Sequence, residues 1–288
     1  MLSKGRRAGR LVSLPAYPWQ RERFWVGGAP AAGAGPRPGP RGLGSHPLLG
    51  FELGSSLHPE ERLWQRELGL GEAGLGYLAD HRVEGVAVAP AALYLALALA
   101  AAREAFGGGA VTLERFTFER LLTLGMEPVR VQVGLTAVAP GRWAVRIASR
   151  QGNEWASHAA GEAIQAPAAP PARWPLAELR ARCSEEVETG EHYRTLAGRG
   201  LEYGPAFQGI ERLWRGGAEA VARLRPPAAD PGPLHPALLD AAFQVLGAPL
   251  PGGEAGGEVL LPVAVERLIL DGEAAAGRWC AADRKSVV

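Results

Sequence analysis

Cysteine is nearly absent from this sequence, which has only Cys183 and Cys280 among its 288 residues. Two cysteines so far apart cannot form a disulfide framework or a cysteine-based zinc site, so we expect a cytoplasmic chain that binds no metal. The net charge is also small, at +1 from 31 basic and 30 acidic residues. This balance gives no electrostatic reason to expect nucleic acid or a membrane surface as a partner.

A long apolar segment is lacking as well. The longest run, residues 86–102, is rich in alanine and interrupted by Pro90, and no charged stretch followed by a short apolar segment opens the chain. The sequence therefore predicts neither a transmembrane helix nor a signal peptide. What is present is an ordinary globular composition, with 47% hydrophobic residues, enough for one large domain or two small ones.

Glycine and proline are concentrated in two tracts, residues 27–44 and 166–175. Such tracts cannot pack a core and are typical of linkers. The aromatic residues within 14–25 need a surface to cover, which indicates the tail of a preceding domain, although a ragged terminus is the alternative. We predict a linker over 1–44, a first half over 45–165, a Pro/Ala-rich connection over 166–189 and a second half over 190–282.

Hydrophobic periodicity predicts sheet and helix in the first half. Apolar and polar residues alternate over 129–136 and again over 143–147, the pattern of an antiparallel hairpin with one buried face. Residues 90–106 are apolar on nearly all sides, begin with proline and end at three glycines. This pattern predicts a helix that a sheet must wrap.

The second half repeats the plan. Strand-like segments at 210–214 and 218–224 precede a predicted helix over 236–246. Two halves, each a sheet curled around one apolar helix, indicate a duplicated α+β architecture, although no residue-level repeat is visible.

Two ionisable residues occupy matching places in these halves. His81 precedes the first apolar helix, and Asp240 lies within the second. A charged residue on an apolar helix face costs free energy unless it is paired or used, so Asp240 is the stronger functional candidate. Taken alone, His81 fits a surface-loop histidine better, and a solvated carboxylate remains an alternative for Asp240.

Five short motifs follow one another along the chain. They are His46-Pro47-Leu48-Leu49-Gly50, His81-x-x-x-Gly85-x-x-x-x-Pro90, Gly200-Leu-Glu-Tyr203-Gly204-Pro205-Ala-Phe207, His235-Pro236-Ala-Leu-Leu-Asp240-x-x-x-Gln244 and Leu261-Pro262. Together they resemble the signatures of dehydratase domains of modular polyketide synthases, and residues 14–25 are similar to the end of the linker that follows the acyltransferase in such synthases. The resemblance covers residues 46 to about 270.

The resemblance implies a double hot-dog fold, in which two antiparallel sheets each wrap a central helix and the active site lies between the halves. It implies dehydration of a β-hydroxyacyl thioester, carried on the phosphopantetheine arm of an acyl carrier protein, with no cofactor bound directly. The parent protein would be a multifunctional transferase of secondary metabolism, such as antibiotic biosynthesis. Its acyltransferase and ketoreductase domains would be neighbours, and a homodimer is expected.

The residue chemistry agrees with this reaction. Loss of water needs a base for the α-proton, and histidine suits that role because its ordinary pKa of about 6.5 leaves a neutral fraction near neutral pH. It also needs an acid for the hydroxyl group, and an aspartate in an apolar slot has a raised pKa. We therefore predict His81 as general base and Asp240 as general acid, with Gln244, one helical turn later, orienting the carboxyl group.

Further motif residues are expected to support the site. Backbone N–H groups near Gly85 and at the start of the Pro90 helix could polarise the thioester carbonyl, although a plain turn and helix cap are the alternative. Tyr203 would hydrogen-bond across the site or pack in the core. Gly204 and Pro205 belong to the same motif.

Some features depart from the family pattern. Leu201 stands where tyrosine is usual and Val265 where an aromatic residue is common, which puts substrate shape in doubt. His158 and His192 have no evident partner, and we expect them on the surface or in strands. Residues 283–288 resemble the translation of a common short-read sequencing adapter, so we expect an assembly artefact and a second half that lacks strands.

Other functions remain open. An olefin-shifting or pyran-forming relative would keep the fold, but such relatives tend to lose the aspartate or the motif proline, and Asp240 and Pro90 are both present. An inactive truncated fragment serving as a scaffold between synthase modules is a second alternative. A free-standing thioesterase or hydratase is disfavoured by the linker-like first 44 residues.

Overall fold

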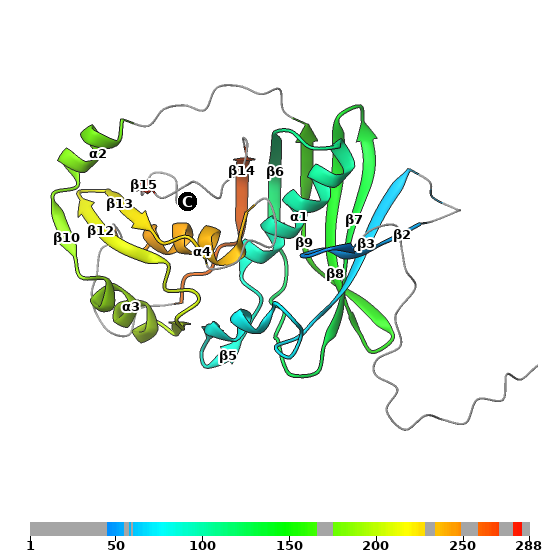
Figure 1. The fold of residues 1–288 in the computed structure, drawn as a ribbon, viewed down its shortest axis with the longest axis horizontal. Helices are drawn as coiled ribbons and strands as arrows, with labels where there is room; N and C mark the ends of the chain where they lie inside the picture. The colour runs from blue at the N-terminus through cyan, green and yellow to red at the C-terminus, as the bar shows by residue number, and fades with distance from the viewer. Residues whose placement is uncertain are drawn as a thin grey trace, which may run out of the picture. The chain divides into compact units, whose positions relative to one another are not determined.

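A computed structural model describes residues 45–54, 58, 60–165, 175–227, 234–248, 259–270 and 279–283 (Figure 1). Within them, an eight-stranded and a four-stranded sheet each pack on one apolar helix, and a small three-stranded sheet links the two halves. The predicted linker over 1–44 lies outside the described residues. So does the predicted artefact beyond Asp283.

The larger sheet is antiparallel throughout, in the order β1-β2-β3-β7-β8-β9-β6-β14. The predicted hairpin is confirmed, with Val133 opposite Ile147, and alternate side chains along it face the core. The strands are β1 (Ser45–His46), β2 (Gly50–Leu53), β3 (Glu61–Leu68), β6 (Val111–Phe118), β7 (Val129–Ala139), β8 (Arg142–Gln151), β9 (Glu154–Gln165) and β14 (Ala264–Leu270).

Helix α1 (Ala91–Phe106) packs against this sheet and confirms the predicted helix. Pro90 is its N-cap, and Gly107 ends it with φ +71°, a left-handed conformation that glycine adopts without a steric penalty. Every residue from Ala92 to Ala102 is buried. Each leucine in this stretch contributes about 2 kcal/mol of hydrophobic stabilisation, and the alanines between them allow close contact with α4 (Pro236–Val245).

The smaller sheet has the order β10-β12-β13-β15 and packs on α4, which confirms the predicted second helix. Side chains alternate along β12, so Leu213 joins the main core, whereas Trp214 lies with Leu179 and Cys183 in a separate cluster beneath α2. The strands and helix are β10 (Glu185–Val187), β12 (Ile210–Gly216), β13 (Glu219–Leu224), β15 (Trp279–Asp283) and α2 (Leu176–Arg182).

The predicted connection over 166–189 is described from residue 175 onward. There it contains α2 and β10, and β10 pairs with β12. Leu179 and Val187 pack against apolar neighbours in this part of the chain.

Two strand pairings join the halves. In the small sheet, β11 (Leu201–Tyr203) of the second half pairs with β4 (His81–Val83), which also pairs with β5 (Val86–Ala87). In the larger sheet, β14 of the second half pairs with β6 of the first. A 3₁₀-helix η1 (Gly76–Asp80) precedes β4, and α3 (Thr189–Gly198) precedes and contacts β11.

The two histidines without an expected partner are both buried. His158 is in β9, as a strand residue, but it is 0% exposed and its Nε2 lies 2.7 Å from Ser149 Oγ. His192 is on α3, not on a strand or the surface, and its Nε2 lies 3.2 Å from the carbonyl oxygen of Gln244. The expectation of a surface or strand position is therefore met by His158, which lies in a strand, and is wrong for His192, which is buried on a helix.

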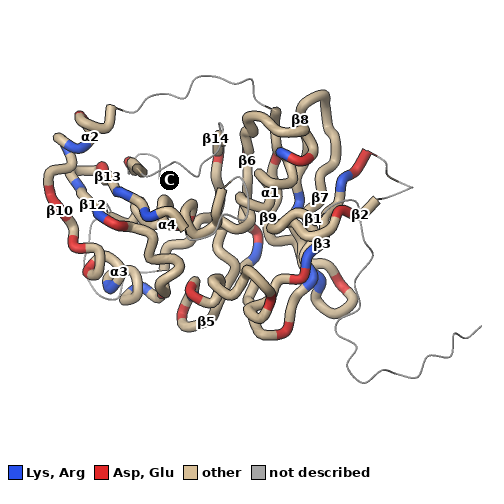
Figure 2. Tube along the Cα trace, in the orientation of Figure 1, with Lys and Arg blue, Asp and Glu red and all other residues tan. Residues whose placement is uncertain are grey.

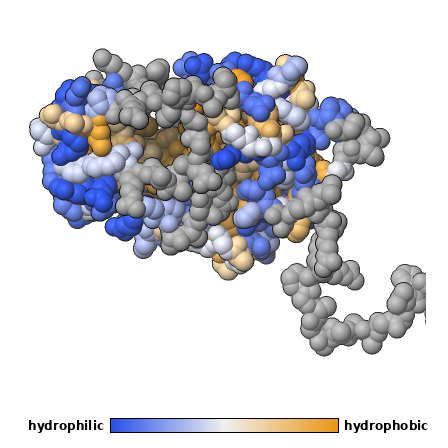
Figure 3. Space-filling model, turned by 45° about the horizontal axis from the view of Figure 1, so that its top comes forward, coloured by the Kyte–Doolittle hydropathy of each residue, from blue (hydrophilic) through white to orange (hydrophobic). Residues whose placement is uncertain are grey.

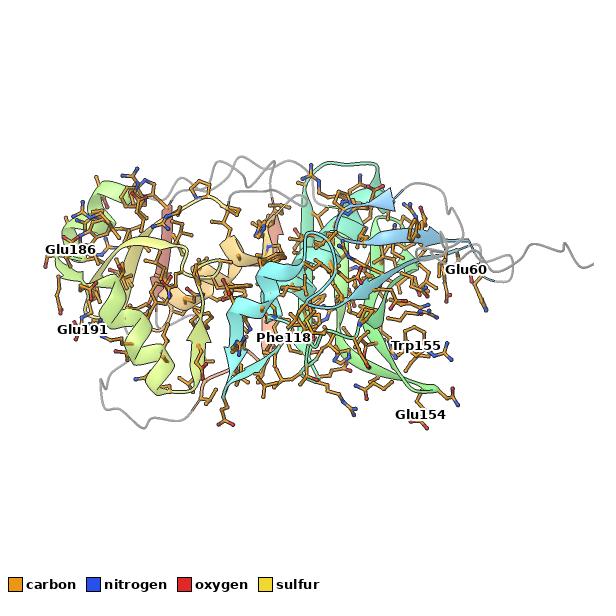
Figure 4. All side chains as sticks on the ribbon, turned by 60° about the horizontal axis from the view of Figure 1, so that its bottom comes forward. Glu60, Phe118, Glu154, Trp155, Glu186 and Glu191 are labelled. Carbon is orange, nitrogen blue, oxygen red and sulfur yellow. The ribbon has the colours of Figure 1, made fainter. Side chains whose placement is uncertain are left out.

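Charged side chains cover the outside of the second half. Acidic residues of β10 face basic residues of β12 (Figure 2), as in the pairs Glu186–Arg212 and Glu185–Arg215. The surface there is largely hydrophilic (Figure 3). Glu186 lies on this outer side, and Trp155 projects at the far end of the first half, where it is 44% exposed (Figure 4). Among the described residues, no helix is long and apolar enough to cross a membrane.

Candidate active site

His81 is the first residue of β4 and is only 7% exposed, which excludes a surface-loop role. Its Nδ1 lies 3.1 Å from the carbonyl oxygen of Val88. Because a carbonyl oxygen can only accept, Nδ1 carries a hydrogen and donates it. In the neutral ring Nε2 therefore keeps its lone pair, and it is the nitrogen that can take a proton.

Asp240 lies in the middle of α4 and is 5% exposed. The helix starts at Pro236, and His235 caps it by accepting a hydrogen bond at Nδ1 from the Ala237 N–H. Burial raises the pKa of the Asp240 carboxyl group above its ordinary value, and nearby His81 and the hydrogen bond from Gln244 act in the opposite direction and offset only part of the shift. A solvated carboxylate is excluded.

The structure brings these two residues together. His81 Nε2 and Asp240 Oδ1 are 3.8 Å apart, although one residue comes from the first half and the other from the second. The separation is longer than a direct hydrogen bond. The site therefore holds a proton acceptor and a carboxyl group face to face, each with its other polar atom already bonded to protein.

Gln244 is held by hydrogen bonds on both ends of its amide. Its Nε2 donates to Asp240 Oδ2 at 2.8 Å and to the carbonyl oxygen of Phe207 at 3.0 Å. Its Oε1 accepts from the Tyr193 hydroxyl at 3.1 Å, and that hydroxyl oxygen accepts from the Ile210 N–H. The amide orientation is thus fixed, and Asp240 Oδ2 is always an acceptor.

Aromatic rings surround His81. Tyr203 is directly opposite it in the β11–β4 pair, with ring centroids 5.5 Å apart, and the Phe207 centroid lies 5.2 Å away. Burial raises the pKa of the Tyr203 phenol, so it stays neutral. Tyr203 thus contacts the site through its ring, and a hydrogen bond across the site stays a prediction.

Gly85 and Pro90 lie where a turn and a helix cap need them. Glu84 and Gly85 have φ +49° and +78° in the two-residue turn between β4 and β5, where glycine is favoured. A Cβ on Gly85 would meet nothing within 4 Å, so close packing of protein does not require glycine there. Pro90 is buried at the N-cap of α1. The turn and cap readings account for both residues, and polarisation of a carbonyl stays a prediction.

Gly204 and Pro205 belong to a turn between β11 and β12. The Phe207 N–H donates to the carbonyl oxygen of Gly204, and a Cβ on Gly204 would lie 2.8 Å from Asp80 Cβ. This glycine is therefore needed for close approach of the two halves, whereas Pro205 is exposed at the turn.

Sequence reasoning missed three residues of this arrangement. Tyr193 and Phe207 hold Gln244, and Asp80 contacts the Gly204 turn. Phe207 stands inside a quoted motif, but it acts through its backbone carbonyl, which no side-chain pattern reveals. No sequence pattern marked Tyr193, because the need of its hydroxyl for a partner follows only from its partly buried position in the structure.

We predict that Tyr193→Phe lowers the free energy of unfolding by about 2 kcal/mol. The change leaves Gln244 Oε1 and the Ile210 N–H without their partner. Urea unfolding would measure the effect. Tyr77→Phe is the matched control, because that buried hydroxyl has no hydrogen-bond partner among the described residues. Equal behaviour of the two variants would contradict the role of Tyr193.

A metal centre is not formed by the described part of the chain, where no group of three or more His, Cys, Asp or Glu side chains could hold an ion. Cys183 and Cys280 are unpaired with one another, and burial raises the pKa of the Cys280 thiol to about 11.

Comparisons with known proteins match both halves. Residues 46–150 match the family model described as polyketide synthase dehydratase domain, and residues 171–287 match the one described as polyketide synthase dehydratase N-terminal domain.

Similar curated proteins are long synthases. A phenolphthiocerol/phthiocerol polyketide synthase of Mycobacterium tuberculosis is 34% identical over 277 residues, which cover 90% of this chain and 14% of that protein. The polyketide synthase GfsE of Streptomyces halstedii is 37% identical over 273 residues, 88% of this chain and 7% of that protein. The chain thus spans a seventh or less of these relatives.

Solved structures of similar fold include single domains. The dehydratase domain from the CurF module of curacin polyketide synthase has a TM-score of 0.76 at 29% identity, covering 83% of this chain and 88% of that one. The dehydratase domain of a mycocerosic acid synthase-like synthase has a TM-score of 0.74 at 31% identity, covering 83% and 86%. The predicted α+β double hot-dog fold is confirmed by these matches.

Proposed function

The chain belongs to the polyketide synthase dehydratase family, and from that premise we propose that it removes water from a β-hydroxyacyl thioester to give the α,β-unsaturated thioester. The observation that carries the proposal is the pairing of a buried histidine and a buried aspartate, Nε2 to Oδ1 at 3.8 Å, across the two halves.

The reaction is assigned to atoms as follows. His81 Nε2 takes the α-proton, the electrons of that C–H bond form the C=C bond, and the β-carbon–oxygen bond breaks. Asp240 donates its proton to the departing hydroxyl group, which leaves as water. His81 is then protonated and Asp240 ionised, and proton exchange with solvent resets both.

The hydrogen bonds described above support this division of roles. Nδ1 of His81 is occupied by the Val88 carbonyl, which leaves Nε2 as the base. Oδ2 of Asp240 is occupied by the Gln244 amide, which leaves Oδ1 to carry the acidic proton. Burial keeps the carboxyl group protonated to higher pH than an ordinary aspartate, as an acid for a poor leaving group requires.

Two solved relatives add support. Inactive variants of the CurK dehydratase, in one of which a histidine is replaced by phenylalanine and in the other an aspartate by asparagine, have TM-scores of 0.74 and 0.70 with this chain. The same two residue types form the site described above.

We propose that the substrate arrives on the phosphopantetheine arm of an acyl carrier protein, with acyltransferase and ketoreductase domains as neighbours, because the curated relatives are polyketide synthases. Elimination of water changes no net oxidation state, so the proposal needs no redox cofactor. Homodimerisation stays a prediction.

Mass spectrometry of a β-hydroxyacyl thioester on a carrier protein, incubated with the full chain, tests the proposal. We expect the loss of one water, and uptake of water when the unsaturated thioester is supplied instead. Unchanged substrates with a chain that melts cooperatively would overturn dehydration. A shifted double bond in the supplied enoyl thioester would then identify an isomerase. The absence of any reaction would identify an inactive scaffold.

A further inference from the structure

Asp80 is a half-buried carboxylate that the proposed chemistry does not use. It is the last residue of η1 and directly precedes His81. Its carboxylate Oδ2 accepts a hydrogen bond from the Ala206 N–H at 2.8 Å, and its carbonyl oxygen accepts one from the Gly204 N–H at 2.7 Å. One residue of the first half therefore binds a turn of the second half twice.

The turn is shaped to receive this side chain. A Cβ built on Gly204 would lie 2.8 Å from Asp80 Cβ and closer still to its carboxyl group, so any larger residue would push the turn away. Tyr203, the residue before the turn, pairs with His81 in the β11–β4 ladder. The turn is therefore held against the first half at two adjacent residues, Gly204 by its contact with Asp80 and Tyr203 by its pairing with His81.

The same turn also holds the acid. The Phe207 carbonyl, one residue after Ala206, accepts from Gln244 Nε2, and that nitrogen donates to Asp240 Oδ2. A continuous path therefore leads from the residue beside the base, through the turn and Gln244, to the carboxyl group. The path connects the two catalytic side chains through protein bonds, and its two ends face each other across the gap between His81 Nε2 and Asp240 Oδ1.

We propose that Asp80 is a positioning residue that sets this gap, by fixing the Gly204–Phe207 turn to the strand that begins with His81. Its kinetic consequence rests on the proposed function. The inference concerns geometry, since Asp80 touches neither reacting atom, and misplacement by about 1 Å costs about 10²-fold in rate.

The first experiment compares Asp80→Ala with Asp80→Asn. The alanine variant lacks the acceptor for the Ala206 N–H, and we expect kcat to fall about 100-fold with KM within about threefold. Asparagine keeps a carbonyl oxygen there, and we expect kcat within about threefold of the original protein. Glu178→Ala, at an exposed carboxylate of α2, is the control and should leave kcat unchanged.

A second variant guards against misfolding of the first. Gly204→Ala leaves Asp80 intact but displaces the turn, and we expect it to reduce kcat as Asp80→Ala does. Crystal structures of the original chain and both variants give a readout independent of turnover. We expect the Nε2–Oδ1 separation to grow by about 1 Å in each.

Failure of this inference can be told apart from failure of the proposed function. If the original chain does not dehydrate its substrate, the proposed function fails, and the crystallographic separation alone decides the role of Asp80. An unchanged separation in Asp80→Ala overturns the inference. So does a kcat for Asp80→Asn as low as that of the alanine variant, or a loss confined to KM.

Discussion

His81→Phe is expected to lower kcat for dehydration about 10³-fold, within the range that a general base contributes. Phenylalanine can keep the ring contacts with Tyr203 and Phe207, whose centroids lie 5.5 and 5.2 Å away. What it loses is Nε2, which takes the α-proton in the proposed reaction, and Nδ1, which holds the ring to Val88. Rates of water loss from the carrier-bound thioester measure the effect.

The control for this variant is His58→Phe, the same substitution at an exposed histidine. It should leave the rate unchanged. Because a buried histidine is replaced, thermal melting of both variants is needed as well. A cooperatively folded His81→Phe variant that retains more than about a tenth of the original rate would contradict the assignment of the base.

Asp240→Asn is expected to reduce kcat by a similar factor, about 10³-fold, because the amide cannot deliver a proton to the hydroxyl group. Asparagine still offers an oxygen to Gln244, so the hydrogen bond to Nε2 is retained. In the proposed mechanism this step requires the protonated carboxyl group. The contribution of Asp240 to the rate is therefore lost as the pH rises through its raised pKa.

Stability has the same sign and gives an independent check. A carboxyl group whose folded-state pKa is raised favours the folded protein at low pH, and this contribution is lost as the pH rises through the folded-state pKa. The Tm of Asp240→Asn minus that of the original chain should therefore increase as the pH increases. Glu178→Gln, an equal charge change at an exposed site, should show no such trend. A Tm difference independent of pH would contradict a buried acid.

Patterns in the chain were sufficient for the elements that carry the site. The proline and glycines around α1 predicted its ends, and alternation predicted the β7–β8 hairpin. The contact between Gln244 and Asp240 was also predictable, because residues four apart share one helix face.

Other features depend on long-range contacts that no local pattern contains. The pairing of β14 with β6 joins residues about 150 positions apart. The structural roles of the Tyr193 hydroxyl and the Asp80 carboxylate depend on hydrogen bonds from backbone N–H groups that are distant in sequence. The expected surface or strand position of His192 is wrong because a single polar residue in the sequence does not show that its neighbours in space cover it.

The pairing of β14 with β6 also bears on how such domains can be recombined. From its composition, the tract at 166–174 looks like a suitable recombination point between two separable halves. A cut there would leave each piece with an unsatisfied strand edge, since β11 would lose β4 and β6 would lose β14. A hybrid synthase should therefore exchange both halves together as one unit, with the recombination points outside both halves.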